Sequence, residues 1–159
     1  MGDRAMCHIR LGGDLPRSKL PELQHHIENY GLLSDWGGAP IDTEVPLLTE
    51  ALDLYGEELN GGLVPDLEKF CVDNALPFWR WSGGCGGAFE PELYANYGTG
   101  DQHYAQAADS EDPVFTAQDV NKANSLDDLK AILANFEREL PPFRITDDIP
   151  AAIDQDTAN

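Results

Sequence analysis

The chain contains 159 residues, of which 42% are hydrophobic, 25% charged and 9% aromatic, a composition that suits one globular domain and argues against a wholly disordered chain. Ten lysine and arginine residues stand against 29 aspartate and glutamate residues, so the formal net charge is −19. A chain this acidic lacks the cations that hold a nucleic-acid backbone or an anionic lipid surface, which argues against direct binding to either.

The sequence carries no sign of a membrane span or of a scaffold built on cysteines. No apolar run approaches the roughly 20 residues that cross a bilayer, and the first residues lack the charged-then-apolar layout of a signal peptide. The three cysteines, Cys7, Cys71 and Cys85, form no C-x-x-C pair, so neither a disulfide framework nor a zinc knuckle is indicated. We therefore expect a cytoplasmic protein with reduced thiols, no metal centre and no cofactor.

The first predicted elements are a strand and a helix. Apolar and polar residues alternate over residues 7–11, which predicts a strand that ends at Gly12-Gly13. A helix is expected over residues 20–30, because apolar side chains recur there at helical spacing, and Gly31 suits a left-handed C-cap.

A long connection over residues 32–46, rich in glycine and proline, separates these elements from the next pair. Alternation predicts a second strand over 50–57. A second helix is expected over about 64–75, and it should stop before Pro77.

Two aromatic segments, residues 77–82 and 89–97, alternate in the manner of strands and are joined by the glycine-rich GGCGGA. They predict a β-hairpin whose second strand is an edge strand or begins after Pro91. One or two further strands are expected within 102–107 and 113–117, on either side of an acidic turn.

The clearest helical pattern covers residues 126–139, where Ser125 and Asp128 approximate a capping box. A short strand is expected over 143–145. The composition from residue 146 onward favours a flexible acidic tail, so we expect one domain over residues 1–145 and a tail over 146–159.

This order of elements predicts an α/β (α+β) fold in which about three helices pack on a mixed sheet. The expected architecture is a two-layer sandwich, either with the ferredoxin-like topology or with another one.

The hairpin region carries a resemblance. Residues 67–97 contain an E-K-F-C helix, an L-P-F-x-R-W-S strand and an F-E-P-E-L-x-x-x-Y strand. These segments resemble a group of small bacterial α/β proteins of unknown function, which also tend to open with a C-x-I-R-L-G-G strand followed by a helix. The glycine loop after Ser82 departs from the tight polar turn of that group. The resemblance implies a compact α/β domain and transfers no catalytic residue.

The glycine loop is the most unusual local feature, because four glycines surround Cys85. No lysine follows and no helix is predicted after it, so it does not match a phosphate-binding loop. Cys85 could act as a nucleophile only if a base such as His103, oriented by Asp101, met it in the fold. The alternative is a loop without chemistry, and it is the reading we favour.

The histidines and acidic clusters match no metal motif. His25 and His26 are adjacent rather than four apart, and no H-E-x-x-H or D-x-[DN]-x-[DN]-G pattern occurs. His8 alternates with Cys7 on its strand, so the two face opposite sides.

The few cations on predicted strands suggest an anion site. Arg10 and Arg80, with His8 and Trp81, would form an anion pocket if all four shared a face of the sheet, because guanidinium groups bind carboxylates bidentately. The competing interpretation pairs both arginines with acidic residues of the chain itself.

The charge is concentrated in the middle of the chain. Residues 20–121 have a net charge of −17 and only two cations, Lys69 and Arg80. The expected acidic surface comprises Asp53, Glu57, Glu58, Asp109, Glu111 and Asp112.

Three hypotheses account for this charge. The favoured one is a non-enzymatic protein that binds a basic protein partner, in the extreme a nucleic-acid-mimicking inhibitor or regulator from a mobile element that occupies a nucleic-acid-binding enzyme. The second is solvation adaptation to high salt, as in halophiles. The third is a small enzyme or ligand-binding domain that uses Cys85 and His103.

Overall fold

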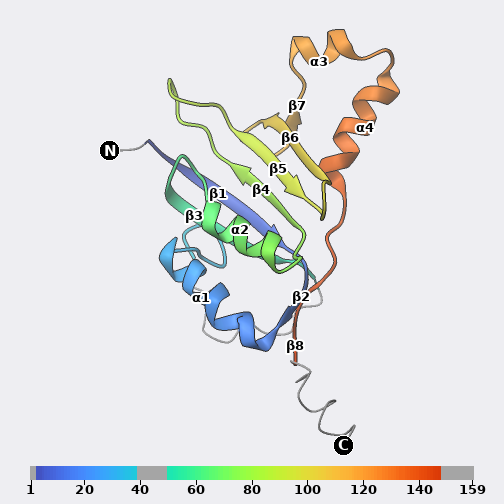
Figure 1. Cartoon of the computed structure of the whole chain (residues 1–159). Coiled ribbons are helices and arrows are strands. Elements are labelled where there is room, and N and C mark those ends of the chain that lie inside the picture. The colour runs from blue at the N-terminus through green and yellow to red at the C-terminus, as the bar shows by residue number, and fades with distance from the viewer. Residues whose placement is uncertain (1–2, 39–49, 148–159) are drawn as a thin grey trace, which may run out of the picture.

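Six strands form one antiparallel sheet in the computed structural model, which describes residues 3–38 and 50–147 (Figure 1). Across the sheet, the order is β3 (Leu52–Asn60), β1 (Arg4–Leu11), β4 (Phe78–Ser82), β5 (Glu92–Asn96), β6 (Gln102–Ala107) and β7 (Pro113–Val114). A separate parallel pair joins β2 (Gly13–Pro16) to β8 (Phe143–Thr146), which ties the end of the described chain to its beginning.

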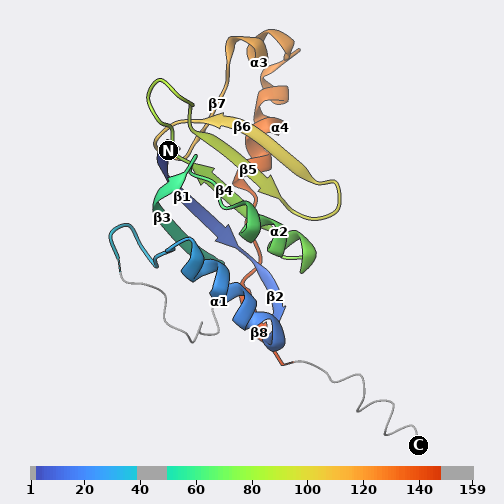
Figure 2. The same cartoon turned by 60° about the vertical axis from the view of Figure 1, so that its left-hand side comes forward.

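Helices cover both sides of the sheet, but unequally. The helical elements are η1 (Arg17–Lys19), α1 (Leu20–Asn29), α2 (Pro65–Asp73), α3 (Ala117–Lys122) and α4 (Leu126–Glu137). In Figure 2, α1 and α2 lie in front of the sheet, and α4 lies behind it, near β5 and β6. Among the described elements, no helix therefore lies on one face of β3 and β1.

The alternation of β1 explains the main core. Cys7, Ile9 and Leu11 are fully buried against α1 and α2, together with Leu23 and Phe70 from those helices. A smaller cluster on the opposite face packs Trp81, Leu93 and Ala95 against Phe136 of α4; its members are Trp81, Leu93, Ala95, Ala107 and Phe136. Successive residues of a strand point to opposite faces, so the central strands β4 and β5 contribute to both clusters.

The α+β class is confirmed, and the expected mixed sheet is corrected. Every neighbouring pair in the six-stranded sheet is antiparallel, and the parallel pairing is confined to β2 and β8. β3 and β4 both run antiparallel to β1, which lies between them, so β3-α2-β4 is one split βαβ unit. β1 and β3, joined through α1, are direct antiparallel neighbours, and a ferredoxin-like arrangement of two split units is not shown.

Most expected elements occur, with boundaries moved by a few residues. α1 begins at Leu20 with Pro21 in its first turn, and it ends before Gly31, which has a φ of 63°. β5 begins after Pro91 and is central in the sheet. The short strand expected at 143–145 occurs as β8, in the parallel pair.

Two elements were not expected from the sequence. β2 follows the turn at Gly12-Gly13, and α3 begins where a strand was expected, because Thr116 and Asp119 form a capping box. The predicted tail over 146–159 lies outside the described residues except for its first two, of which Thr146 belongs to β8.

In the described residues, no helix is long and apolar enough to span a membrane.

Candidate functional site

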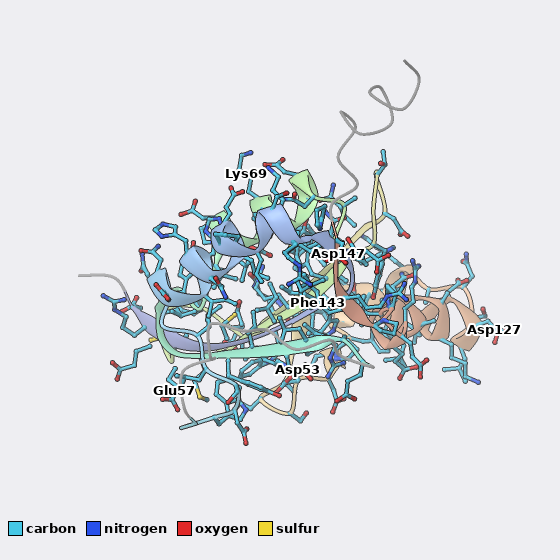
Figure 3. All side chains as sticks on the ribbon, turned by 90° about the horizontal axis from the view of Figure 1, so that it is seen from below. Asp53, Glu57, Lys69, Asp127, Phe143 and Asp147 are labelled. Carbon is cyan, nitrogen blue, oxygen red and sulfur yellow. The ribbon has the colours of Figure 1, made fainter. Side chains whose placement is uncertain are left out.

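The face of β3 and β1 that lacks a helix carries charged and aromatic side chains. Asp53 and Glu57 project from this face, away from α1 and α2 (Figure 3). Near the end of β3 the pairing is Ala5 with Leu59 and Cys7 with Gly56, so Glu57 and Glu58 together stand opposite one residue of β1. This β-bulge leaves both glutamates exposed.

The acidic turn after β6 folds over the same face. The indole Nε1–H of Trp81 donates to the carbonyl oxygen of Ala108 at 2.9 Å, which holds the start of the turn on the sheet. Within the turn, the backbone N–H of Ala108 donates to the Asp112 carbonyl, and that of Glu111 donates to the Ala108 carbonyl. Glu111 has a φ of 71°, a left-handed conformation that non-glycine residues rarely adopt.

His8 joins the turn to β3. Its Nε2 lies 2.7 Å from Oδ1 of Asp53, and its Nδ1 lies 2.5 Å from Oε1 of Glu111. The His8 residue is 5% exposed. Burial opposes the charged form, but the hydrogen bonds and charges of the two carboxylates outweigh it and raise the pKa of His8 above its usual 6.5.

Aromatic rings surround His8. Its ring stacks on Tyr55 with a centroid separation of 4.4 Å and meets the edge of Trp79 at 5.1 Å. Trp36, from the segment after α1, packs on Tyr55 at 4.7 Å and on Trp81 at 6.4 Å, and it remains 36% exposed. We call the rings beneath the charged groups the aromatic floor; it comprises Trp36, Tyr55, Trp79 and Trp81.

Three carboxylates from separate segments converge on Tyr55. Burial raises the pKa of the Tyr55 hydroxyl, and the negative charges of Asp53, Glu111 and Asp35 raise it further. Asp35 belongs to the segment whose Leu33 pairs with Tyr55, and the N–H of Gly37 in that segment donates to Glu57 at 2.8 Å. We call the resulting surface the acidic face; it comprises Asp35, Asp53, Glu57, Glu58, Asp109, Glu111 and Asp112.

Arg10 lies at one end of the acidic face. Its Nε donates to Asp53 at 2.9 Å, and its guanidinium lies over Trp79, 5.4 Å from the ring centroid. Beside it, a shallow hollow of about 380 Å³ is lined by residues that include Glu50, Asp53 and Glu139. The hollow therefore brings three acidic residues around one cation.

Arg80 is on the other face of the sheet, so the suggested anion pocket does not form. His8, Arg10 and Trp81 share one face, but Arg80 is adjacent to Trp81 in β4 and points toward α2. Its Nε donates to Glu68 at 2.9 Å, and it also contacts Ser82 and Glu92. The competing interpretation, that the arginines pair with acids of the chain, describes both Arg10 and Arg80.

Cys85 and His103 lie at opposite ends of the sheet. Cys85 is in the β4–β5 loop, beyond the end of the sheet where Ser82 pairs with Glu92, whereas His103 pairs with Ala95 near the other end of β5. His103 Nε2 does lie 2.6 Å from Asp101, as expected of an oriented imidazole. Within residues 3–38 and 50–147, Cys85 pairs with Phe89 in its own loop and His103 with Asp101, so the structure separates the two weak catalytic candidates.

Among residues 3–38 and 50–147, no group of three or more histidine, cysteine, aspartate or glutamate side chains is arranged to hold a metal ion.

The sequence singled out six of the seven acidic residues of the acidic face but missed how they are joined. The alternation of β1 placed His8 and Arg10 on one face, which was a usable signal. Asp35, Trp36 and Tyr55 had no motif to mark them, and the contact between His8 and Glu111 spans 103 residues.

Comparison with family models, with curated proteins and with solved structures finds no match for the chain. The candidate site therefore rests on its own geometry.

Proposed function

We propose that this protein binds a basic protein partner through the acidic face. The observation that carries the proposal is the convergence of two acidic segments, β3 and the turn at 108–112, which are about 50 residues apart in the sequence and meet at His8. Convergence concentrates charge on one surface, and concentrated charge steers and orients a partner of opposite sign.

The chain's own cations leave most of this charge uncompensated. The ion pairs within the described residues involve eight different carboxylates, of the 24 that these residues contain: Asp14, Asp53, Glu68, Asp73, Glu92, Asp101, Glu111 and Asp147. Only Asp53 and Glu111 of the acidic face are among them. Glu57, Glu58, Asp109 and Asp112 are exposed and have no cation of the described chain within ion-pair distance.

The surface also offers features besides charge. Trp36, about a third of which is exposed, provides an aromatic contact of the kind enriched at protein interfaces. The hollow beside Arg10, with Glu50, Asp53 and Glu139 around it, could accept a lysine or arginine side chain. The proposed partner class is a nucleic-acid-binding protein, because such proteins display clustered lysine and arginine, and the proposed effect is inhibition by occupying that surface.

Two matched variants test the proposal. The face variant carries Glu57→Gln, Glu58→Gln, Asp109→Asn and Asp112→Asn; the control variant carries Glu22→Gln, Glu28→Gln, Asp127→Asn and Glu137→Gln, on α1 and α4. Both remove four negative charges from exposed positions. The immobilised proteins are used to capture partners from lysate, the captured proteins are identified by mass spectrometry, and their affinities are measured at several salt concentrations.

We expect the wild-type chain and the control variant to retain a basic nucleic-acid-binding protein, and the face variant to bind it at least tenfold more weakly. The affinity should fall steeply as salt rises from 50 to 200 mM, since exposed charges are screened over about 10 Å. Equal losses in the two variants would show that only the overall charge matters, and would overturn a specific acidic face.

A further inference from the structure

His8 has a hydrogen-bonding arrangement that only its charged form satisfies. Both ring nitrogens lie within 2.7 Å of a carboxylate oxygen, Nε2 at Asp53 and Nδ1 at Glu111. A neutral imidazole has one N–H, so one of its nitrogens would direct a lone pair at a carboxylate. The imidazolium donates to both carboxylates at once.

The position of the 108–112 turn depends on this arrangement. Two side-chain hydrogen bonds attach the turn to the sheet face: the Trp81 indole to Ala108, and His8 to Glu111. Glu111 is held in a left-handed conformation, which is unfavourable for a non-glycine residue. The contact with His8 holds Glu111 in this conformation, together with the backbone hydrogen bonds inside the turn.

The charged groups around His8 come from three segments. β3 contributes Asp53, which Arg10 of β1 also contacts, and the hydroxyl of Tyr55; the turn contributes Glu111; and the segment after α1 contributes Asp35, close to Tyr55. The neighbouring side of β4 contributes the rings of Trp79 and Trp81, which do not titrate. Acidic groups thus predominate, and they favour the imidazolium.

We propose that His8 is a proton-operated latch, whose imidazolium pins the 108–112 turn to β3 and whose deprotonation releases Glu111 and uncovers the aromatic floor of the acidic face. The latch is a property of the isolated chain. Its regulatory consequence rests on the proposed function: the open face has lost one positive charge at its centre, so a basic partner binds it more tightly.

The direction of the pH dependence follows from the histidine. Its pKa is raised in the folded state, so the stabilisation that the latch provides is fully present below pH 6.5 and is lost as the pH rises through the folded pKa. The latch therefore opens on the alkaline side of that pKa.

The test follows two NMR signals of the full chain between pH 5.5 and 9.5: the His8 ring and the Trp81 indole N–H, which reports the position of Ala108. We expect both signals to titrate together with a pKa above 6.5. Glu111→Gln should lower the His8 pKa by about 1 unit and weaken the coupled change at Trp81, because a nearby opposite charge shifts a pKa by about 1–3 units. Asp109→Asn, which makes the same charge change in the same turn without contacting His8, should shift it far less.

Titration of His8 at or below pH 6.5, a Trp81 signal that does not follow it, or equal effects of the two variants would overturn the latch. The proposed function is tested separately, by binding of a nona-arginine peptide below and above the His8 pKa. Coupled titration without peptide binding at the acidic face would overturn the proposed function and leave the latch. Binding there with the same affinity at both pH values would overturn the regulation alone.

Discussion

Removal of the buried guanidinium of Arg80 should destabilise the protein strongly and in a pH-dependent way. Arg80 is 3% exposed, and its partner Glu68 on α2 has a side chain that is 15% exposed. Arg80→Met fills a similar volume but leaves the Glu68 carboxylate buried without a cation. Loss of one partner of a buried pair costs about 3–5 kcal/mol of unfolding free energy, and we expect about 3 kcal/mol at pH 7, because some water reaches Glu68.

The same variant should be less destabilised at pH 5. Burial raises the pKa of Glu68, and Arg80 partly offsets that rise, so loss of Arg80 raises this pKa further. A carboxyl group whose folded pKa is raised contributes stability below its unfolded pKa, and this contribution is lost as the pH rises through the folded pKa. A larger fraction of Glu68 is protonated at pH 5, which reduces the cost of leaving it unpaired.

Urea denaturation at pH 5 and pH 7, followed by circular dichroism, measures both effects. The double variant Arg80→Met/Glu68→Leu should recover most of the lost free energy, because it removes the orphaned charge. A loss below about 1 kcal/mol at pH 7, or equal losses at the two pH values, would refute the description of Arg80 and Glu68 as a buried ion pair.

Three further predictions follow from other parts of the fold. In thermal melts, Gly62→Ala should destabilise the protein by more than Gly61→Ala. Both residues have a φ near 65°. A Cβ on Gly62 would lie 2.9 Å from the backbone carbonyl oxygen of Met6, whereas a Cβ on Gly61 would meet no atom closer than 3.6 Å. A thiol-specific reagent should label Cys85 in the native chain and reach Cys7 and Cys71 only after unfolding. Both of these cysteines are fully buried, and burial raises the pKa of Cys7 to about 12. Rapid labelling of all three cysteines in the native chain would contradict the described core. Thermal melts from 0.1 to 3 M KCl should show a cooperative transition even at 0.1 M, and a chain that folds only in molar salt would favour solvation adaptation as the origin of its acidity.

Local patterns in the sequence predicted the elements that local forces determine. The alternation of β1, the apolar spacing of α1 and α2, and the aromatic hairpin of β4 and β5 all occur close to where they were expected. The sequence did not predict α3, because Val120 is the only large apolar residue in this helix and it is exposed. The helix therefore has no apolar periodicity. Only its capping residue, Thr116, carried a signal.

The arrangement of the strands could not be predicted in the same way. β1 lies between β3 and β4, and neither pairing is a hairpin, so the sheet order depends on long-range packing rather than on turn residues. The parallel pairing of β2 with β8 joins residues about 130 apart. The strand patterns alone predicted a mixed sheet, whereas the six-stranded sheet of the structure is antiparallel throughout.

The acidic face shows the same division between local and long-range information. Its residues are visible in the sequence as an acidic strand and an acidic turn, and alternation places His8 and Arg10 on one face. Alternation also excludes Arg80 from the face of Trp81, because the two are neighbours in one strand. That the turn crosses the sheet to reach His8 depends on the Trp81 contact with Ala108, which has no signature in the sequence.

The most direct test of the acidic face is a map of where a cationic ligand binds. Backbone amide NMR signals of the full chain are recorded during titration with a nona-arginine peptide at moderate salt. Binding at the acidic face predicts that the largest shifts cluster at residues 35–38, 53–58 and 108–112 and disappear in the face variant but not in the control variant. Shifts spread evenly over all exposed acidic residues, or centred on the acidic start of α4, would contradict the claim that this surface is the binding site.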